Sequence, residues 1–158
     1  LASYLLNARP LVVLTSPVIY SLIIPIVMLD LWMTIYQAVC FPIYGIPKVQ
    51  RSDYIRLDRR HLAYLNWVEK LNCEYCSYAN GLFALATEVA ARTEQYWCPI
   101  KHALRMKSMH SRYHYFFYFL DAERYRQQIE TVRRSFEDIK EASAAAHSGS
   151  SPASRTRS

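Results

Sequence analysis

The hydrophobic pattern of this chain begins with a long apolar stretch near the N-terminus. Residues 11–29 are 19 consecutive positions without a charged side chain. Asp30 interrupts the run, and the apolar character then resumes as far as Ile46. About 20 apolar residues are enough to cross the hydrocarbon core of a bilayer. The pattern therefore predicts one tilted transmembrane helix over roughly residues 11–36, with residues 40–46 lying in the membrane interface.

Three other interpretations of this stretch remain open. It could form a re-entrant hairpin that turns near Pro25 and Asp30, the buried core helix of a soluble protein, or a cleaved signal peptide. A single span is favoured because it places Asp30 near one end, where its carboxylate can reach water. A small domain has little with which to cover so long an apolar helix. A signal peptide is disfavoured because the run is long and is preceded only by Arg9 as a basic side chain.

The residues after the apolar run suit a membrane–water interface. Aromatic side chains are expected to form an interfacial belt, and they are Trp32, Tyr36, Phe41 and Tyr44. Residues 48–60 contain five Lys or Arg against two Asp. Because basic residues are retained on the cytoplasmic side of membranes, this stretch predicts a cytoplasmic location for everything that follows.

Apolar positions downstream recur at helical spacing. Asp58 is expected to cap a helix that runs at least to Leu71 and could continue through the cysteines beyond it. The Asn80-Gly81 pair could end this helix or mark a turn before a second helix that reaches about Arg92. A short helix is expected to start at Cys98, since Pro99 suits the first helical position.

A last helix is expected after Asp121, which is a favourable capping residue. Its apolar stripe is Tyr125, Ile129, Val132, Phe136 and Ile139. The Ala- and Ser-rich end of the chain is expected to be disordered. The predicted fold is therefore all-α, with one N-terminal transmembrane helix, a small cytoplasmic helical domain and a disordered tail. The expected boundaries are 1–46 for the anchor and interfacial segment, 47–141 for the domain and 142–158 for the tail.

Composition narrows the classes further. Only three glycines occur in 158 residues, which argues against a turn-rich β fold. The 13 tyrosines suit large contact surfaces, and the net charge of +6 suits a body lying against anionic lipid headgroups. No nucleic-acid-binding motif accompanies the basic charge, so nucleic acid is not an expected partner. No small-molecule substrate is evident either.

Candidate chemistry concentrates in a short window that follows the pattern C-x2-C-x21-C-x3-H. The residues are Cys73, Cys76, Cys98 and His102. Three thiolates and an imidazole are a ligand set typical of structural zinc, with iron as the alternative. Glu69 and His61 are candidates for an outer shell because their spacing places them on one helical face with the first two cysteines. Buried inert thiols and a dithiol redox pair remain open alternatives.

Three segments of the chain resemble a group of small uncharacterised bacterial membrane-associated proteins. They are DRRHLAYLNW at 58–67, the stretch 71–81, and 90–102, whose WCPIKH sequence at 97–102 is the most specific part. The resemblance covers roughly residues 30–113. It implies a bacterial source and an apolar N-terminus before a Cys/His-bearing cytoplasmic part. It implies no particular activity or ligand.

Three functions are compatible with these features. The favoured one is a non-enzymatic accessory protein of the bacterial inner membrane, with a structural Cys/His metal site, that contacts lipid and docks onto a larger membrane complex. The second is a metal- or electron-handling assembly factor, and the third is a membrane-bound thiol oxidoreductase. The first is favoured because the chain is rich in aromatic residues and lacks the paired acid, base and nucleophile groups that catalysis needs.

Overall fold

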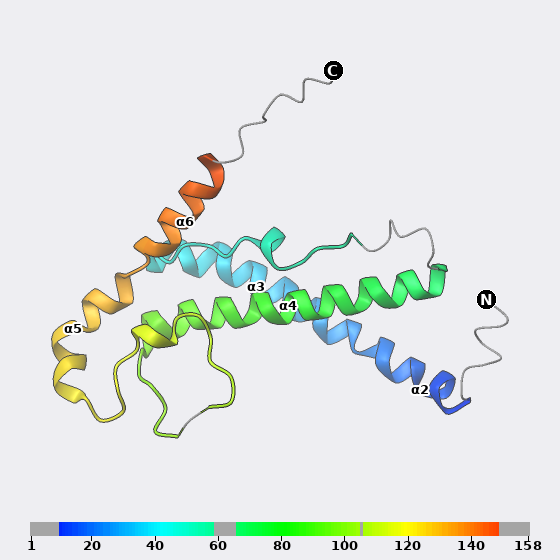
Figure 1. Ribbon diagram of the computed structural model, residues 1–158, viewed down its shortest axis with the longest axis horizontal. Helices are drawn as coiled ribbons and strands as arrows, with labels where there is room; N and C mark the ends of the chain where they lie inside the picture. The colour runs from blue at the N-terminus through cyan, green and yellow to red at the C-terminus, as the bar shows by residue number, and fades with distance from the viewer. Residues whose placement is uncertain (1–9, 59–65, 105, 149–158) are drawn as a thin grey trace, which may run out of the picture. The chain divides into compact units, whose positions relative to one another are not determined.

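A computed structural model describes residues 10–58, 66–104 and 106–148 of the chain. Within these ranges the chain forms α-helices and short 3-10 turns, and no β-strand is present (Figure 1). The helices are α2 (Pro10–Ser21), α3 (Ile23–Tyr44), α4 (Trp67–Trp97), α5 (Ala122–Arg134) and α6 (Glu137–Ser148). The all-α prediction, with a long apolar N-terminal helix followed by further helices, is confirmed.

The chain divides into two compact units. The first combines Leu1–Val39 with Val49–Ala90, and the second combines Cys40–Lys48 with Ala91–Ser158. Each unit therefore takes part of α3 and part of α4. This division differs from the sequence-based boundaries, because the segment after α3 folds back onto its own helix instead of beginning a separate domain.

The helices α2 and α3 together form the long apolar element that the sequence predicts. They are separated only at Leu22, and Pro25 accounts for the interruption because it has no N–H to donate to the carbonyl of Ser21. From Ile23 onward the helix passes through Asp30 without a break. A re-entrant hairpin that turns near Pro25 and Asp30 is therefore excluded.

In the second unit, the C-terminal end of α3 is closed by a glycine cap. Gly45 has a φ of +70°, which favours glycine. The amide of Ile46 donates to the carbonyl of Phe41 at 2.9 Å, and the amide of Gly45 donates to Pro42 at 3.4 Å. These two bonds are the pattern of a Schellman motif, and they explain why α3 ends at Tyr44.

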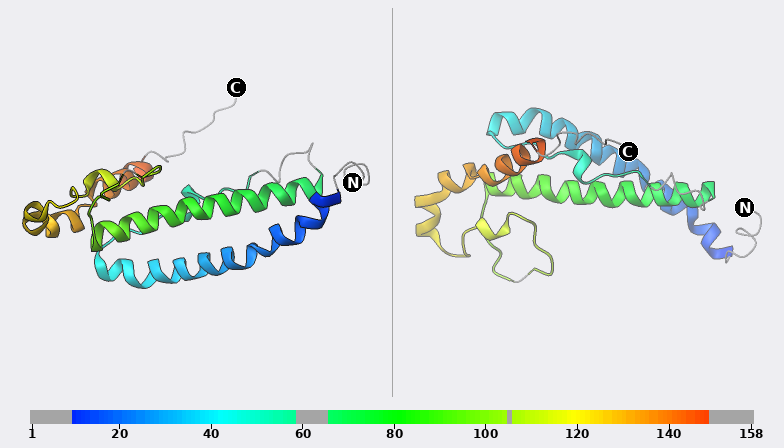
Figure 2. Two further views of the ribbon diagram at one scale, coloured as in Figure 1. Left: turned by 90° about the horizontal axis from the view of Figure 1, so that it is seen from below. Right: turned by 45° about the horizontal axis from the view of Figure 1, so that its top comes forward.

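In the first unit, α4 runs parallel to α2 and α3. Tyr20 is bonded to Asn72 near the start of α4, and Asp30 further along is bonded to Tyr78. Figure 2 shows the shared direction: α2 and α3 run from blue to cyan, and α4 runs the same way from green to yellow-green. A parallel pair requires the chain to return between them, and residues 49–58 run back along α3 to do so.

The start of α4 is fixed by a reciprocal cap. The Glu69 amide donates to Asn66 Oδ1 and the Asn66 amide donates to Glu69 Oε2, each at 2.9 Å. This is a capping box. The sequence-based expectation of a cap at Asp58 is wrong for α4, because the helix begins nine positions later at Trp67. The expected helical positions Leu62 and Leu65 lie outside the described residues.

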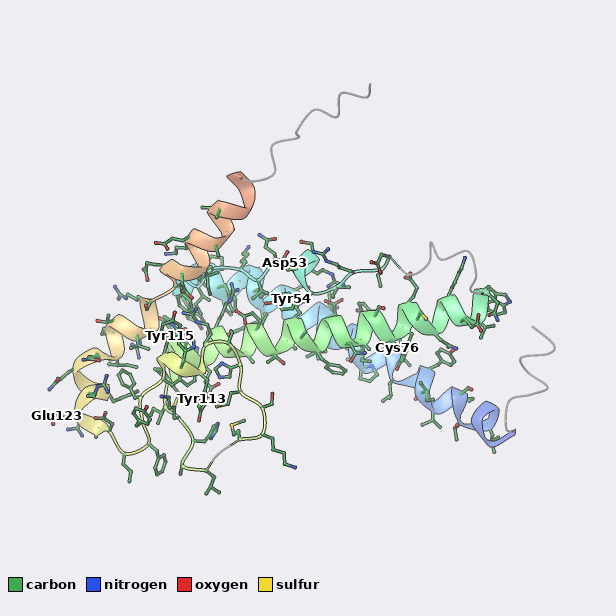
Figure 3. All side chains as sticks on the ribbon, in the orientation of Figure 1. Asp53, Tyr54, Cys76, Tyr113, Tyr115 and Glu123 are labelled. Carbon is green, nitrogen blue, oxygen red and sulfur yellow. The ribbon has the colours of Figure 1, made fainter. Side chains whose placement is uncertain are left out.

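Gly81 does not end a helix or form a turn, since α4 continues through it to Trp97. It lies instead where the returning segment crosses the helix. A Cβ atom at position 81 would lie 2.6 Å from the backbone oxygen of Tyr54 and 3.1 Å from Ile55 Cα. The missing side chain allows the two backbones to approach this closely. Figure 3 labels Tyr54 on the returning segment.

We expect Gly81→Ala to destabilise the first unit by about 1–3 kcal/mol, because the added methyl group overlaps backbone that must move. In an unobstructed helix the same change would instead stabilise the protein by up to ~1 kcal/mol, so a loss of stability indicates steric overlap at position 81. Thermal unfolding of the full chain in neutral detergent micelles measures the effect. Asn80→Ala, at the exposed neighbouring position, is the control and should be neutral or slightly stabilising. Equal effects of both substitutions would contradict the close approach at Gly81.

In the second unit, the expected short helix at Cys98 does not form. Residues 98–104 contain no helix, and Ile100 forms an isolated parallel bridge with Phe117. The Phe117 amide donates to Pro99 at 2.8 Å and the Lys101 amide donates to Phe117 at 2.7 Å. Pro99 thus supplies a carbonyl acceptor to the aromatic segment, residues 113–120. This pairing anchors that segment, of which Phe116 and Phe117 are buried.

The last predicted helix is present but divided. Asp121 caps α5 by accepting from the amide of Arg124, as expected. Ser135 and Phe136 separate α5 from α6, and Phe136 is only 1% exposed. The predicted tail from 142 onward is helical in its first part, because α6 extends to Ser148. Residues 149–158 lie outside the described part of the chain.

Candidate functional site

The four predicted metal ligands are not brought together. Cys73 and Cys76 lie in the first half of α4, and Cys98 follows its last residue. The helix is uninterrupted between Cys76 and Cys98, and at about 1.5 Å per residue it separates them by roughly 30 Å along its axis. His102 lies in the loop beyond, where its ring stacks on Tyr113 with centroids 6.4 Å apart. All four cysteines of the chain are free.

Among the described residues, no group of three or more His, Cys, Asp or Glu is placed to hold a metal ion. Glu69, a candidate for the outer shell, is engaged in the capping box at the start of α4. His61, the other candidate, lies outside the described residues. Figure 3 labels Cys76 on α4, and its side chain is exposed. Neither zinc nor iron gains support from this arrangement.

The four predicted interfacial aromatic residues differ in how far their side chains are exposed. Trp32 is 64% exposed and points away from the body of the first unit, while Tyr36 is half-buried. Phe41 is completely buried, so it contributes to packing and cannot contact lipid. Tyr44 stacks on Tyr96 at a centroid distance of 4.9 Å. Only Trp32 is therefore fully available to an external apolar phase.

Within the first unit, α3 has a buried inward face and an exposed outward face. Its inward face is buried or half-buried at every third or fourth residue and includes the polar residues Asp30 and Gln37. Its outward face is apolar and exposed over its whole length. The outward residues are Ile24, Val27, Met28, Leu31, Trp32, Ile35 and Val39, which we call the α3 stripe. Over the longer apolar helix Leu14–Tyr44, which takes in α3 and most of α2, only 11% of the most apolar window is buried.

The inward face of α3 holds a polar cluster that joins three segments of the first unit. Asp30 accepts hydrogen bonds from Arg51 on the returning segment and from Tyr78 on α4, the latter at 2.6 Å. Gln37 lies two turns further along, and its Oε1 accepts from the amide of Val49 at 2.9 Å. These bonds fix the return path of the chain along α3. They also give Asp30 a partner within the chain.

The second unit is organised around the buried guanidinium of Arg112, whose side chain is 3% exposed. It donates to Gln95 Oε1 at 2.5 Å, to the Ser135 carbonyl at 2.8 Å and to Asp138 at 2.5 Å. Gln95 also donates to the carbonyls of Val132 and Ser135, both at 2.8 Å. Two carbonyl groups at the end of α5, those of Val132 and Ser135, are thereby satisfied.

The charge of Arg112 changes the acid–base behaviour of Asp138. Partial burial by itself raises the pKa of this carboxyl. The hydrogen bond from Arg112 and its positive charge outweigh that effect, so the pKa lies below its ordinary value. Arg112 also lies 4.4 Å from the ring centroid of Tyr115, which Figure 3 labels on the 3-10 turn Tyr113–Tyr115. With its guanidinium 3% exposed and three acceptors engaged, Arg112 serves to hold the second unit together.

No protein-family model, no curated protein and no solved structure matches this chain.

The features best suited to a function are therefore the α3 stripe and the segments that cover the opposite face of α3. The residues of the stripe follow the helical period. Both faces of α3 are largely apolar in sequence, however, so periodicity alone does not show which face is exposed. Asp30 was the available signal, because a carboxylate within an apolar helix must face a partner. The role of Arg112 had no comparable signal in the sequence.

Proposed function

We propose that this chain is a non-enzymatic accessory protein that is anchored to a membrane by α2 and α3 and docks onto a larger membrane complex. The observation that supports it is the α3 stripe, an apolar surface that the chain leaves exposed along the whole first-unit part of α3. One helix of the described chain, Leu14–Tyr44, is long and apolar enough to cross a bilayer. A core helix of a soluble protein would be mostly buried, whereas this one is not.

The return path of the chain favours an in-plane position for α3 over a transmembrane one. The returning segment lies along the inward face of α3, and its charged residues Arg51, Asp53, Arg56 and Asp58 are exposed. If α3 crossed the bilayer, these side chains would lie at hydrocarbon depth, which costs about 2.5–3.5 kcal/mol for each unpaired charge at a helix centre. An amphipathic element lying in the interface avoids this cost, with apolar side chains in lipid and charged ones in water.

Charge supports the choice of membrane face. The net charge of +6 favours contact with anionic headgroups, and the basic stretch 48–60 favours the cytoplasmic face, which we propose is that of a bacterial inner membrane. Exposed aromatic residues outside α3 offer surface for a protein partner. They include Trp67, Phe83, Trp97, Tyr118 and Phe119, all more than half exposed.

We expect Leu31→Glu combined with Ile35→Glu to release the protein from membranes. Both side chains belong to the α3 stripe, and a carboxylate at each position would have to enter the lipid. The measurement is flotation of the full chain with vesicles containing phosphatidylglycerol, where the bound fraction should fall by at least tenfold. Thr87→Glu combined with Ala90→Glu is the matched control, since both positions are exposed on α4. Unchanged flotation of the stripe variant would overturn the anchor.

Reporter fusions at the two ends of the chain distinguish the in-plane position from a span. A reporter that works only in the cytoplasm should be active both before Leu1 and after Lys140, because an in-plane helix leaves both ends on one side. Activity of a periplasm-only reporter at either end would contradict this arrangement. A shortened chain in the membrane fraction would indicate a cleaved signal peptide instead.

A native gel of the same extract tests for the larger membrane complex. The protein should migrate far above the 18.5 kDa of the single chain.

A further inference from the structure

A pocket of about 310 Å³ lies within the first unit, between the junction of α2 and α3, the returning segment and the first half of α4. Tyrosine rings and aliphatic side chains, among them Leu57 and Leu71, form most of its wall. Glu74 is the one acidic side chain among the described residues that line it. The volume is at the lower end of the range for small-molecule sites, so it suits a small ligand or a single chemical group of a larger one.

Three tyrosines line this pocket with their hydroxyl groups already engaged. Tyr20 donates to Asn72 Oδ1, Tyr75 donates to the Ile19 carbonyl at 2.9 Å, and Tyr78 donates to Asp30 at 2.6 Å. Tyr20 and Tyr75 also pack edge to face, with ring centroids 5.8 Å apart. The rings are therefore held in place by the protein. What they offer a ligand is their aromatic surface.

Glu74 is the unusual member of the pocket wall. Its Oε1 atom is shielded from solvent and has no hydrogen-bond partner. A shielded carboxylate oxygen without a donor is costly, and nearly all such atoms in folded proteins are satisfied. The other polar side-chain groups among the described residues of the wall are the tyrosine hydroxyls, which donate elsewhere, so none of them supplies the missing donor. A ligand in the pocket that carries a positive charge and an N–H group would pair with the Glu74 carboxylate, whose half-buried side chain must turn to bring this oxygen to the ligand.

We propose that this pocket binds a primary alkylammonium group, with the ammonium on Glu74, its positive charge beside the tyrosine rings, and the attached carbon chain against Leu57 and Leu71. Carboxylate and aromatic rings together are the surroundings in which organic ammonium groups are recognised. The same chemistry occurs in the headgroup of an aminophospholipid and in a free organic amine. The proposal does not rest on the membrane anchor, because the pocket and Glu74 are present whether or not α2 and α3 contact lipid.

Calorimetric titration of the full chain in neutral detergent micelles tests the site, with hexylammonium as the probe and hexanol as its uncharged counterpart. The wild-type protein should bind hexylammonium at least tenfold more tightly than hexanol, as a charge-assisted hydrogen bond predicts. Glu74→Gln should remove that preference while leaving hexanol binding unchanged. Glu88→Gln is the matched control, since Glu88 is half-buried on the same helix and lies outside the pocket wall.

Substitutions of Tyr75 test the aromatic part separately. Tyr75→Phe keeps the ring and should retain most of the preference, whereas Tyr75→Leu should reduce it several-fold. A wild-type protein that shows no preference for the amine would overturn the proposal. So would an equal loss of hexylammonium and hexanol binding in Glu74→Gln, because Glu74 would then support only the shape of the pocket.

Competition identifies the source of the ligand. Phosphatidylethanolamine added to the same micelles should displace hexylammonium if the site takes a lipid headgroup, and added phosphatidylglycerol should not. Failure of both to displace the probe, with the Glu74-dependent preference intact, assigns the site to a free amine. The assay is performed in micelles, so a protein that fails to float with vesicles can still bind the amine, and the reverse also holds.

Discussion

Replacing Arg112 with leucine is expected to destabilise the second unit by about 3–5 kcal/mol, the largest effect of any single substitution considered for this chain. The guanidinium joins Gln95, the end of α5 and the start of α6 through three hydrogen bonds. Its removal leaves Gln95 Oε1 without its donor in a fully buried position. Amide hydrogen exchange in α5 and α6, measured in detergent micelles, should accelerate well before exchange in the first half of α4.

Two further variants separate geometry from charge. Arg112→Lys keeps the positive charge but lacks the planar fork that reaches three acceptors, so it should recover only a minor part of the lost stability. Arg124→Leu is the surface control, because Arg124 is 59% exposed and lies 3.9 Å from Asp121. Exposed ion pairs contribute ~0–1 kcal/mol, so this substitution should cost little stability. If Arg112→Lys were as stable as the wild-type protein, the hydrogen-bond fork would not be the cause.

Acidification provides an independent measurement of the same contact. Because the pKa of Asp138 is lowered in the folded protein, its contribution to stability is present above the ordinary pKa and is lost as the pH falls through the folded value. The wild-type protein should therefore lose more stability on acidification below about pH 4 than Arg112→Leu does. Asp138 is 46% exposed, so the difference between the two proteins should be small but of this sign.

Local signals in the sequence predicted the features that depend on local physics. The cap at Asp121 follows from side-chain chemistry at one position, and the structure confirms it. The apolar character of residues 11–29 predicted a long helix, and α2 and α3 supply it. The inward stripe from Tyr125 to Ile139 is also buried or half-buried as expected, although Ser135 divides its helix. Each of these depends on neighbours within a few turns.

Sequence-based predictions failed where a residue that is typical of one local structure is present because of a contact with a distant part of the chain. The Asn80-Gly81 pair has the composition of a turn, but Gly81 is required because the Tyr54 backbone crosses α4 there. Because α4 continues through Gly81, it separates Cys76, in its first half, from Cys98, which follows its last residue. The metal hypothesis depended on a chain reversal between them. Nothing in the cysteine spacing itself could test that assumption.

The partner of Asp30 illustrates the same limit. A carboxylate in an apolar helix predicts that some polar group faces it. The identity of that group depends on the path of residues 49–58, which run back along α3 and bring Arg51 to it. Periodicity describes helices and not the direction of a connecting segment. The parallel arrangement of α3 and α4, and with it the in-plane position proposed for α3, was therefore not available from the sequence.

Removing Arg51 is expected to cost more stability than removing Asp30, although the two form one ion pair. The Asp30 side chain is 11% exposed, whereas that of Arg51 is 49% exposed. In Arg51→Met the carboxylate stays shielded and retains only the hydroxyl of Tyr78, so the first unit should lose roughly 2–4 kcal/mol. In Asp30→Leu the guanidinium can turn into water, and the loss should be about 1–2 kcal/mol.

The double variant Asp30→Leu with Arg51→Met decides the cause. If the cost of Arg51→Met comes from a stranded carboxylate, removing the carboxylate as well should recover at least half of the lost stability, because a shielded ion pair is often replaceable by apolar side chains. Thermal unfolding in neutral micelles of the four proteins gives the coupling energy directly. Additive losses, or an Asp30→Leu variant less stable than Arg51→Met, would show that the pair acts through packing.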